Sequence, residues 1–134
     1  MAGLLSRSRR LAAVTSLALV LLARALPSGC LAAADTRPYD EKLLRLAEIM
    51  GAVHYLRELC SANDGQIWRQ RMQDLIEREG TSALRKATLT RSFNQGYRSY
   101  ARTYASCTPS AQSAITRFLA EGAGIADDLA KTAR

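Results

Sequence analysis

The sequence predicts an all-α fold, a four-helix up-down-up-down bundle closed by one disulfide. Four segments carry apolar residues at the spacing of one α-helix face, and short breaks separate them, with no strand pattern in between. Two cysteines, Cys60 and Cys107, lie at the C-terminal ends of the first and third segments. In such a bundle the first and third helices run parallel, so these two ends meet at the same pole. The helical pattern and the cysteine positions therefore support one topology.

The first two helices are predicted over residues 39–60 and 66–79, separated by a turn that contains Asn63 and Gly65. Pro38 suits the first turn of the earlier helix. A solvated face on that helix is expected to carry Glu41, Arg45 and Glu48. The apolar positions of the first helix are Leu43, Leu46, Ile49, Met50, Val53, Leu56 and Cys60, and those of the second are Trp68, Met72, Leu75 and Ile76.

A long third helix is predicted to start at a cap formed by Thr81 or Ser82 and to end at Cys107. Steps of three and four residues place one apolar stripe on a single side of it. Glycine inside a helix costs about 1 kcal/mol relative to alanine, so Gly96 in this stripe predicts a closely approaching neighbouring backbone. The stripe comprises Leu89, Phe93, Gly96, Tyr100, Tyr104 and Cys107.

The fourth helix is predicted to begin at Thr108 and Pro109, a strong start signal. Its apolar residues repeat in steps of four and three, as in the seam of a coiled coil. Because Gly122 and Gly124 weaken its middle, a kink or an early stop is expected there. The seam comprises Ala111, Ile115, Phe118, Gly122, Ile125 and Leu129.

Residues 1–34 are predicted to be a signal peptide, which leaves a single helical domain over residues 35–134. A basic start precedes an apolar run, Leu11–Ala23, which is shorter than the about 20 residues that span a bilayer. Three alanines ending at Ala34 provide a small-residue cleavage site. The mature protein is therefore expected in the periplasm, without a transmembrane helix.

Two other processing sites remain open. The first is the small-residue pattern Ala23-Arg24-Ala25, and the second is a lipoprotein-like cut before Cys30. In the second pattern a proline stands where lipid-modified sequences usually have leucine. Cleavage after Ala34 is preferred to both.

Charge does not indicate a nucleic-acid-binding protein once the signal peptide is set aside. The whole chain has a formal net charge of +7, but four basic and no acidic residues lie in residues 1–34. The remaining 15 basic and 12 acidic residues give a net charge of +3. Basic-aromatic recognition motifs are absent as well, so nucleic acid is excluded as the expected partner.

Cys60 and Cys107 form an even pair in a chain that is predicted to be exported, and export places thiols in an oxidising compartment. A disulfide between them is the prediction. Their spacing fits no C-x-x-C redox motif and no zinc-ligand pattern. A haem attachment sequence is also absent, so neither a metal nor a cofactor is expected.

Three segments carry a resemblance to a known family: RPYDEKLLRLAEIMGAVHYLRELC, WRQRMQDLIERE, and SFNQGYRSYARTYASCTPSAQSAI with EGAG after it. Together they extend from Thr36 to about Asp128. The chain resembles a family of small uncharacterised exported proteins of alphaproteobacteria. The resemblance implies an exported helical domain with paired cysteines, and it assigns no catalytic or binding role to any residue.

A buried polar network between the helices is one candidate site. His54 and Arg57 project from the same side of the first helix as Met50 and Val53, and buried polar groups need partners. Either the network is structural and fixes helix register, or it forms a polar pocket that binds a small anionic ligand, with Arg57 and Arg98 providing the charge. Its predicted members are His54, Arg57, Asn94, Tyr97 and Glu121.

A basic face on the third helix is the other candidate, because no acidic residue occurs between Gly80 and Ala120. This face is either solvated or docks an acidic envelope protein or an anionic envelope surface. With a single histidine and no nucleophile beside a plausible base, catalysis is not expected. A non-catalytic adaptor domain of the cell envelope is the preferred function. The basic face comprises Arg85, Lys86, Arg91, Arg98 and Arg102.

Overall fold

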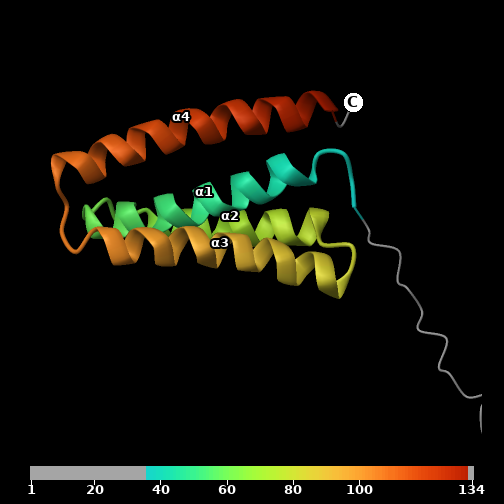
Figure 1. Cartoon of the computed structure of the whole chain (residues 1–134), viewed down its shortest axis with the longest axis horizontal. Coiled ribbons are helices and arrows are strands. Elements are labelled where there is room, and N and C mark those ends of the chain that lie inside the picture. Colours follow the sequence, from blue (N-terminus) through green and yellow to red (C-terminus); the bar gives the residue numbers. More distant parts are fainter. Residues whose placement is uncertain (1–35, 133–134) are drawn as a thin grey trace, which may run out of the picture. The chain divides into compact units, whose positions relative to one another are not determined.

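The computed structural model describes residues 36–132, which form four α-helices. These are α1 (Asp40–Leu59), α2 (Gly65–Glu79), α3 (Ala83–Thr103) and α4 (Pro109–Thr132). Consecutive helices run in opposite directions, so α1 and α3 are parallel (Figure 1). No strand occurs in this range. The predicted all-α up-down-up-down fold is confirmed, whereas the predicted signal peptide lies outside the described residues.

The central helix is α1. It packs against α2, α3 and α4, whereas the backbones of α3 and α4 stay apart and these two helices meet through side chains such as Tyr100 and Phe118. One apolar cluster joins α1 to α4 around Leu56 and Phe118, and a second joins α1 to α2 and α3 around Leu43, Met72 and Leu89. A helix with three neighbours buries residues on several sides, which is why α1 lacks the single apolar stripe of a surface helix.

Because α4 lies over one side of α1, the predicted solvated face of this helix is wrong for two of its three residues. Glu41 is exposed, but Arg45 and Glu48 are only partly exposed. The Nε of Arg45 donates to Oε1 of Glu121 on α4 at 2.7 Å, and its guanidinium lies 5.7 Å from the centre of the Phe118 ring. The ion pair with Arg45 lowers the pKa of Glu121. A charged contact therefore joins α1 to α4.

The close approach predicted at Gly96 is confirmed, and its partner is a second glycine. Gly51 of α1 and Gly96 of α3 are both buried. A Cβ on Gly96 would overlap with the carbonyl oxygen of Glu48, and a Cβ on Gly51 would overlap with that of Phe93. The two backbones therefore touch at a crossing where neither helix tolerates a side chain.

The third helix starts at the predicted cap but ends earlier than predicted. The Ser82 hydroxyl accepts a hydrogen bond from the Arg85 N–H at 3.2 Å. At the other end, α3 stops at Thr103, and Tyr104 is extended, with φ −122° and ψ 114°. The hydroxyl of Tyr55 on α1 donates to the carbonyl of Tyr104, which fixes the chain where it leaves the helix. Cys107 therefore lies in the α3–α4 connection.

The fourth helix starts as predicted but has no early stop. Pro109 is its first residue, and the Ala111 N–H donates to the Thr108 hydroxyl at 3.1 Å. The helix continues to Thr132 through both glycines, so the early stop expected at Gly122 and Gly124 is wrong. Gly122 is buried, and the position that a Cβ would occupy on it faces the side chain of Ile49 on α1. The packing of α4 on α1 therefore outweighs the low helix propensity of glycine.

The predicted disulfide is confirmed. Cys60 and Cys107 are bonded with their Cα atoms 4.9 Å apart, and the bond joins the end of α1 to the α3–α4 connection. This pole is also held by Arg57, whose Nε donates to Oδ1 of Asp64 at 2.9 Å across the α1–α2 turn. Two positive φ angles, 56° at Ser61 and 53° at Asn63, shape that turn.

Removal of the disulfide by Cys60→Ser with Cys107→Ser is expected to lower the free energy of unfolding by about 4 kcal/mol, because the bond closes a loop of 47 residues in the unfolded chain. Urea unfolding, followed by far-ultraviolet circular dichroism with and without reductant, measures the loss. Equal stability of the oxidised protein and the double variant would contradict it.

Candidate functional site

Four basic residues form one exposed strip along α3. Lys86, Arg91, Arg98 and Arg102 are all exposed, and none of them has an ion pair within residues 36–132. Arg91 and Arg98 are seven residues apart, which places their side chains on the same face about 10 Å apart along the axis. Together with Asn94 these side chains border a shallow depression built from α3 alone. These four residues are called the basic strip below.

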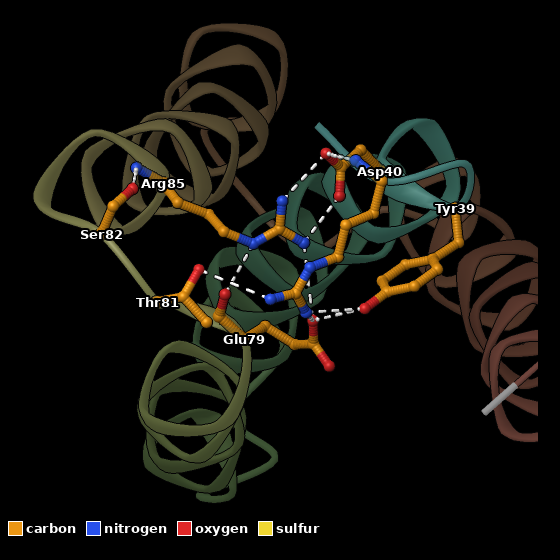
Figure 2. Close-up of polar contacts among 7 residues, drawn as sticks. Tyr39, Asp40, Glu79, Thr81, Ser82 and Arg85 are labelled. Carbon is orange, nitrogen blue, oxygen red and sulfur yellow. Dashed lines mark hydrogen bonds and ion pairs between the residues drawn. The ribbon is translucent and has the colours of Figure 1, made fainter. Parts of the chain in front are cut away.

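The fifth residue of the predicted basic face, Arg85, does not belong to the basic strip. Its side chain is only 7% exposed and points to the pole where α1 begins, α2 ends and α3 begins (Figure 2). Its Nη2 lies 2.6 Å from Oδ1 of Asp40, and its Nε donates to the carbonyl of Glu79 at 2.6 Å. Arg85 therefore joins the ends of three helices and is not available to a partner.

A second arginine, Arg37, completes this cluster. Arg37 Nη1 donates to Oε2 of Glu79 at 3.1 Å and to the hydroxyl of Tyr39 at 2.8 Å, and its backbone N–H donates to Asp40 at 2.8 Å. The guanidinium of Arg85 holds the pKa of Asp40 below its usual range. The group Arg37, Tyr39, Asp40, Glu79 and Arg85 is called the Arg85 cluster below.

A sequence signal for the Arg85 cluster exists. One more step of four residues toward the N-terminus extends the α3 stripe from Leu89 to Arg85, which places Arg85 on the inward face. Asp40 and Glu79 occupy the helix ends that meet the start of α3 in an up-down-up-down bundle. Arg85 was predicted to lie on the basic face because only its charge was considered.

Of the five residues predicted to form a polar network, the structure brings three together. His54 is buried on α1, and its ring lies 5.5 Å from the ring of Tyr97 and 5.8 Å from that of Phe93. Asn94, which is exposed, lies one helical turn from Tyr97. His54, Asn94 and Tyr97, together with Phe93, line a cavity of about 400 Å³ between α2 and α3, called the His54 cavity below.

Within the described residues, one nitrogen of the His54 imidazole is hydrogen-bonded and the other is not. Its Nδ1 lies 2.8 Å from the carbonyl oxygen of Gly65, which can only accept, so Nδ1 carries the proton of this hydrogen bond. Nε2 has no hydrogen-bond partner in the part of the chain that the structure describes. In the neutral ring Nε2 is therefore an unpaired acceptor in a side chain that is 6% exposed.

The other two predicted network residues lie elsewhere. Glu121 pairs with Arg45 at 2.7 Å, and Arg57 pairs with Asp64 at the disulfide pole. Glu121 is separated from His54 because α4 is antiparallel to α1, and Glu121 therefore lies nearer the opposite pole. Arg69 of α2, which the sequence reasoning missed, is the arginine that lines the His54 cavity.

Residues 36–132 contain no group of three or more histidine, cysteine, aspartate or glutamate side chains arranged to hold a metal ion. None of their helices has an apolar stretch long enough to cross a lipid bilayer.

These features define a small α-helical domain, tied by a disulfide at one pole and by the Arg85 cluster at the other. The chain belongs to a family described as a protein of unknown function (DUF2385), whose model matches residues 38–132. Comparisons with curated proteins and with solved structures gave no match.

Proposed function

We propose that this chain is an exported, non-catalytic interaction domain of the cell envelope that docks an acidic partner protein through the basic strip on α3. The observation that carries the proposal is that Lys86, Arg91, Arg98 and Arg102 are exposed on one helix and have no ion pair among the described residues. Arg45, Arg57 and Arg85 are instead ion-paired within the fold. Arg71 and Arg78 on α2 are, like the strip residues, exposed and without an ion pair in the described range.

Location in the periplasm is part of this proposal. It is supported by the secretory pattern of residues 1–34 and by the resemblance to exported alphaproteobacterial proteins. A structural disulfide such as Cys60–Cys107 is also typical of compartments that oxidise thiols. Fractionation of the native cell, with immunodetection of the chain before and after spheroplasting, tests this location.

The basic strip suits a docking role because of its geometry. A helix presents residues seven apart on one face, so Arg91 and Arg98 meet the same surface of a partner. Arginine forms bidentate hydrogen bonds with carboxylates and tolerates desolvation better than lysine does. Since the strip is exposed, salt will screen its attraction for an acidic partner.

The double charge reversal Arg91→Glu with Arg98→Glu is expected to reduce capture of the partner about tenfold or more, because like charges then face each other in the complex. Crosslinking in the native periplasm, followed by mass spectrometry of the captured proteins, measures this loss. Capture by the unaltered chain should fall steeply as the salt concentration rises.

The matched control is Arg117→Glu with Lys131→Glu, which makes the same charge change on exposed positions of α4. Neither residue belongs to the depression that the strip borders, which is lined by α3 alone, so this variant leaves the strip intact. If both variants capture the same proteins as the unaltered chain does, the strip is only a solvated face and the proposal fails.

A second candidate function, binding of a small anionic ligand, is favoured by the unpaired Nε2 of His54. This nitrogen would accept a hydrogen bond from a ligand hydroxyl, and Arg69 provides a positive charge for a ligand carboxylate. The rings of Phe93 and Tyr97 flank the imidazole. A hydroxylated carboxylate matches this chemistry.

Citrate is a suitable probe for the His54 cavity. We expect citrate to shift the ¹⁵N resonance of His54 Nε2, and Arg69→Ala to weaken its binding about tenfold, since a charge-assisted hydrogen bond contributes roughly 1.5–3 kcal/mol. Arg117→Ala, on the exposed face of α4, is the control. An unchanged Nε2 resonance at saturating citrate would contradict this candidate.

A further inference from the structure

An apolar groove runs between α2 and α4, two helices whose backbones do not approach each other closely within the described residues. Its floor is formed by α1, with Leu46, Ile49 and Met50, and its volume is about 460 Å³. Trp68 and Leu75 belong to the α2 wall. This α2/α4 groove is separate from the basic strip and from the His54 cavity, with which it shares no lining residue.

Most residues on the α4 side of the groove have small side chains, which project little into it. Gly122, Ala123 and Ala126 line it beside Leu119, which is exposed although it is a large apolar residue. The floor is nevertheless almost covered, since Ile49 is 2% exposed and Met50 is 6% exposed. An α-helix of about 10–12 Å diameter does not fit into a groove of about 460 Å³, whereas a single hydrocarbon chain is far thinner.

The α2 edge of the groove is cationic. Arg71 and Arg78 line it seven residues apart, and neither has an ion pair within residues 36–132. Asp74 lies between them and accepts a hydrogen bond from Gln70 at 3.4 Å. The α4 wall contributes no charged residue, so the edge as a whole has one excess positive charge.

A hydrogen-bond donor in the α2 wall also lacks an acceptor. The indole N–H of Trp68 is buried without a hydrogen-bond partner in the described part of the chain, although most buried donors are paired. The guanidinium of Arg71 lies 5.0 Å from the centre of the indole ring. A buried donor without a partner therefore lies on the same wall as an unpaired cation.

We propose that the α2/α4 groove binds a single-chain fatty-acid anion. Its hydrocarbon chain lies along Leu46, Ile49 and the small residues of α4, and its carboxylate lies at Arg71, with Arg78 adding positive charge to the same edge of the groove. The apolar lining provides the affinity for the chain, and the two guanidinium groups favour an anionic over a neutral head group.

Fluorescence of Trp68, the one tryptophan of the chain, reports on occupancy directly. Octanoate, decanoate and dodecanoate are titrated below their critical micelle concentrations, with calorimetry as a second readout. Affinity is expected to rise about fourfold for each added methylene, because each one buries further apolar surface. Affinity that does not depend on chain length would overturn the proposal.

Three variants test the location of the site. Ala123→Phe fills the groove from an exposed position and is expected to abolish binding of dodecanoate, whereas Ala120→Phe, exposed on α4 outside the lining, is expected to leave it unchanged. Arg71→Gln with Arg78→Gln is expected to weaken dodecanoate about tenfold and to leave uncharged dodecanol unaffected. Equal binding by all variants would overturn the assignment of the site.

A competing occupant of the α2/α4 groove, a second copy of this chain, has its own outcome in the same experiment. Sedimentation of the unaltered protein would then show a dimer that Ala123→Phe converts to a monomer, and this result would overturn the fatty-acid proposal. Circular dichroism of each variant confirms that a loss of binding does not arise from unfolding. Loss of partner capture by the basic-strip variants leaves this test unaffected, since the two sites share no residue.

Discussion

The Gly96→Ala variant is expected to be strongly destabilised. A methyl group at this position overlaps with the carbonyl oxygen of Glu48, and a backbone atom cannot avoid the overlap by changing rotamer. Overpacking usually costs about 1–3 kcal/mol, and separation of α1 from α3 puts this variant at or above the upper end of that range. Domains of this size are stable by only about 5–15 kcal/mol, so a loss of this size lowers the urea midpoint strongly. Urea unfolding followed by circular dichroism measures it.

Gly124→Ala is the matched control for this prediction. Gly124 is also a mid-helix glycine, but a Cβ there meets no atom within 4 Å. Alanine at an exposed helical position stabilises by about 0.5–1 kcal/mol relative to glycine, so this variant should be more stable than the unaltered chain. If both alanine variants change stability in the same direction, the crossing of α1 and α3 is not the constraint that the structure indicates.

The sequence predicted one half of this crossing and not the other. Gly96 interrupts a clear apolar stripe, which made its close contact visible. Gly51 lies in α1, where buried residues occur on several sides, so no stripe marked it as special. Periodicity detects a helix with one buried face. A central helix has several, and for the same reason Arg45 was assigned to solvent although α4 partly covers it.

The candidate polar network shows a second limit. The pattern correctly indicated that His54 is buried and that Tyr97 lies near it, because helical spacing defines which face a residue occupies. Helical spacing alone did not predict how far along the bundle axis each residue lies. Glu121 lies 12 residues after the start of α4, about 18 Å along the axis, whereas His54 lies five residues before the end of α1, about 8 Å. Counting from the disulfide pole would have separated them.

Long charged side chains were the hardest to place from the sequence. Arg57 bends to Asp64 across the turn, and Arg85 turns inward to Asp40, although both arginines were assigned to candidate binding sites. Their positions depend on which carboxylates the tertiary fold brings within reach, which helical spacing alone does not contain. The exposed arginines of α3 could be predicted because no acidic residue lies near them in the sequence.

The Arg85→Ala variant is expected to destabilise the domain by about 3 kcal/mol, because it leaves the carboxylates of Asp40 and Glu79 without the guanidinium that joins three helix ends. The cost lies at the lower end of the range for broken buried ion pairs because both carboxylates keep some contact with solvent. Arg91→Ala, which removes an exposed arginine from the same helix, should change stability by less than about 0.5 kcal/mol. Chemical unfolding at neutral pH compares the two.

The pH dependence of unfolding distinguishes the ion pair from a loss of packing. Arg85 lowers the pKa of Asp40, so the folded state holds this carboxylate in its charged form. The contribution of Asp40 to stability is therefore complete above the pKa of the unfolded chain and is lost as the pH falls below about 4. In Arg85→Ala the pKa of Asp40 should return toward its usual range, so stability should fall less between pH 5 and pH 2.5 than it does in the unaltered chain. An Arg85→Ala variant that keeps the full acid dependence would show that its side chain acts through packing and not through its charge.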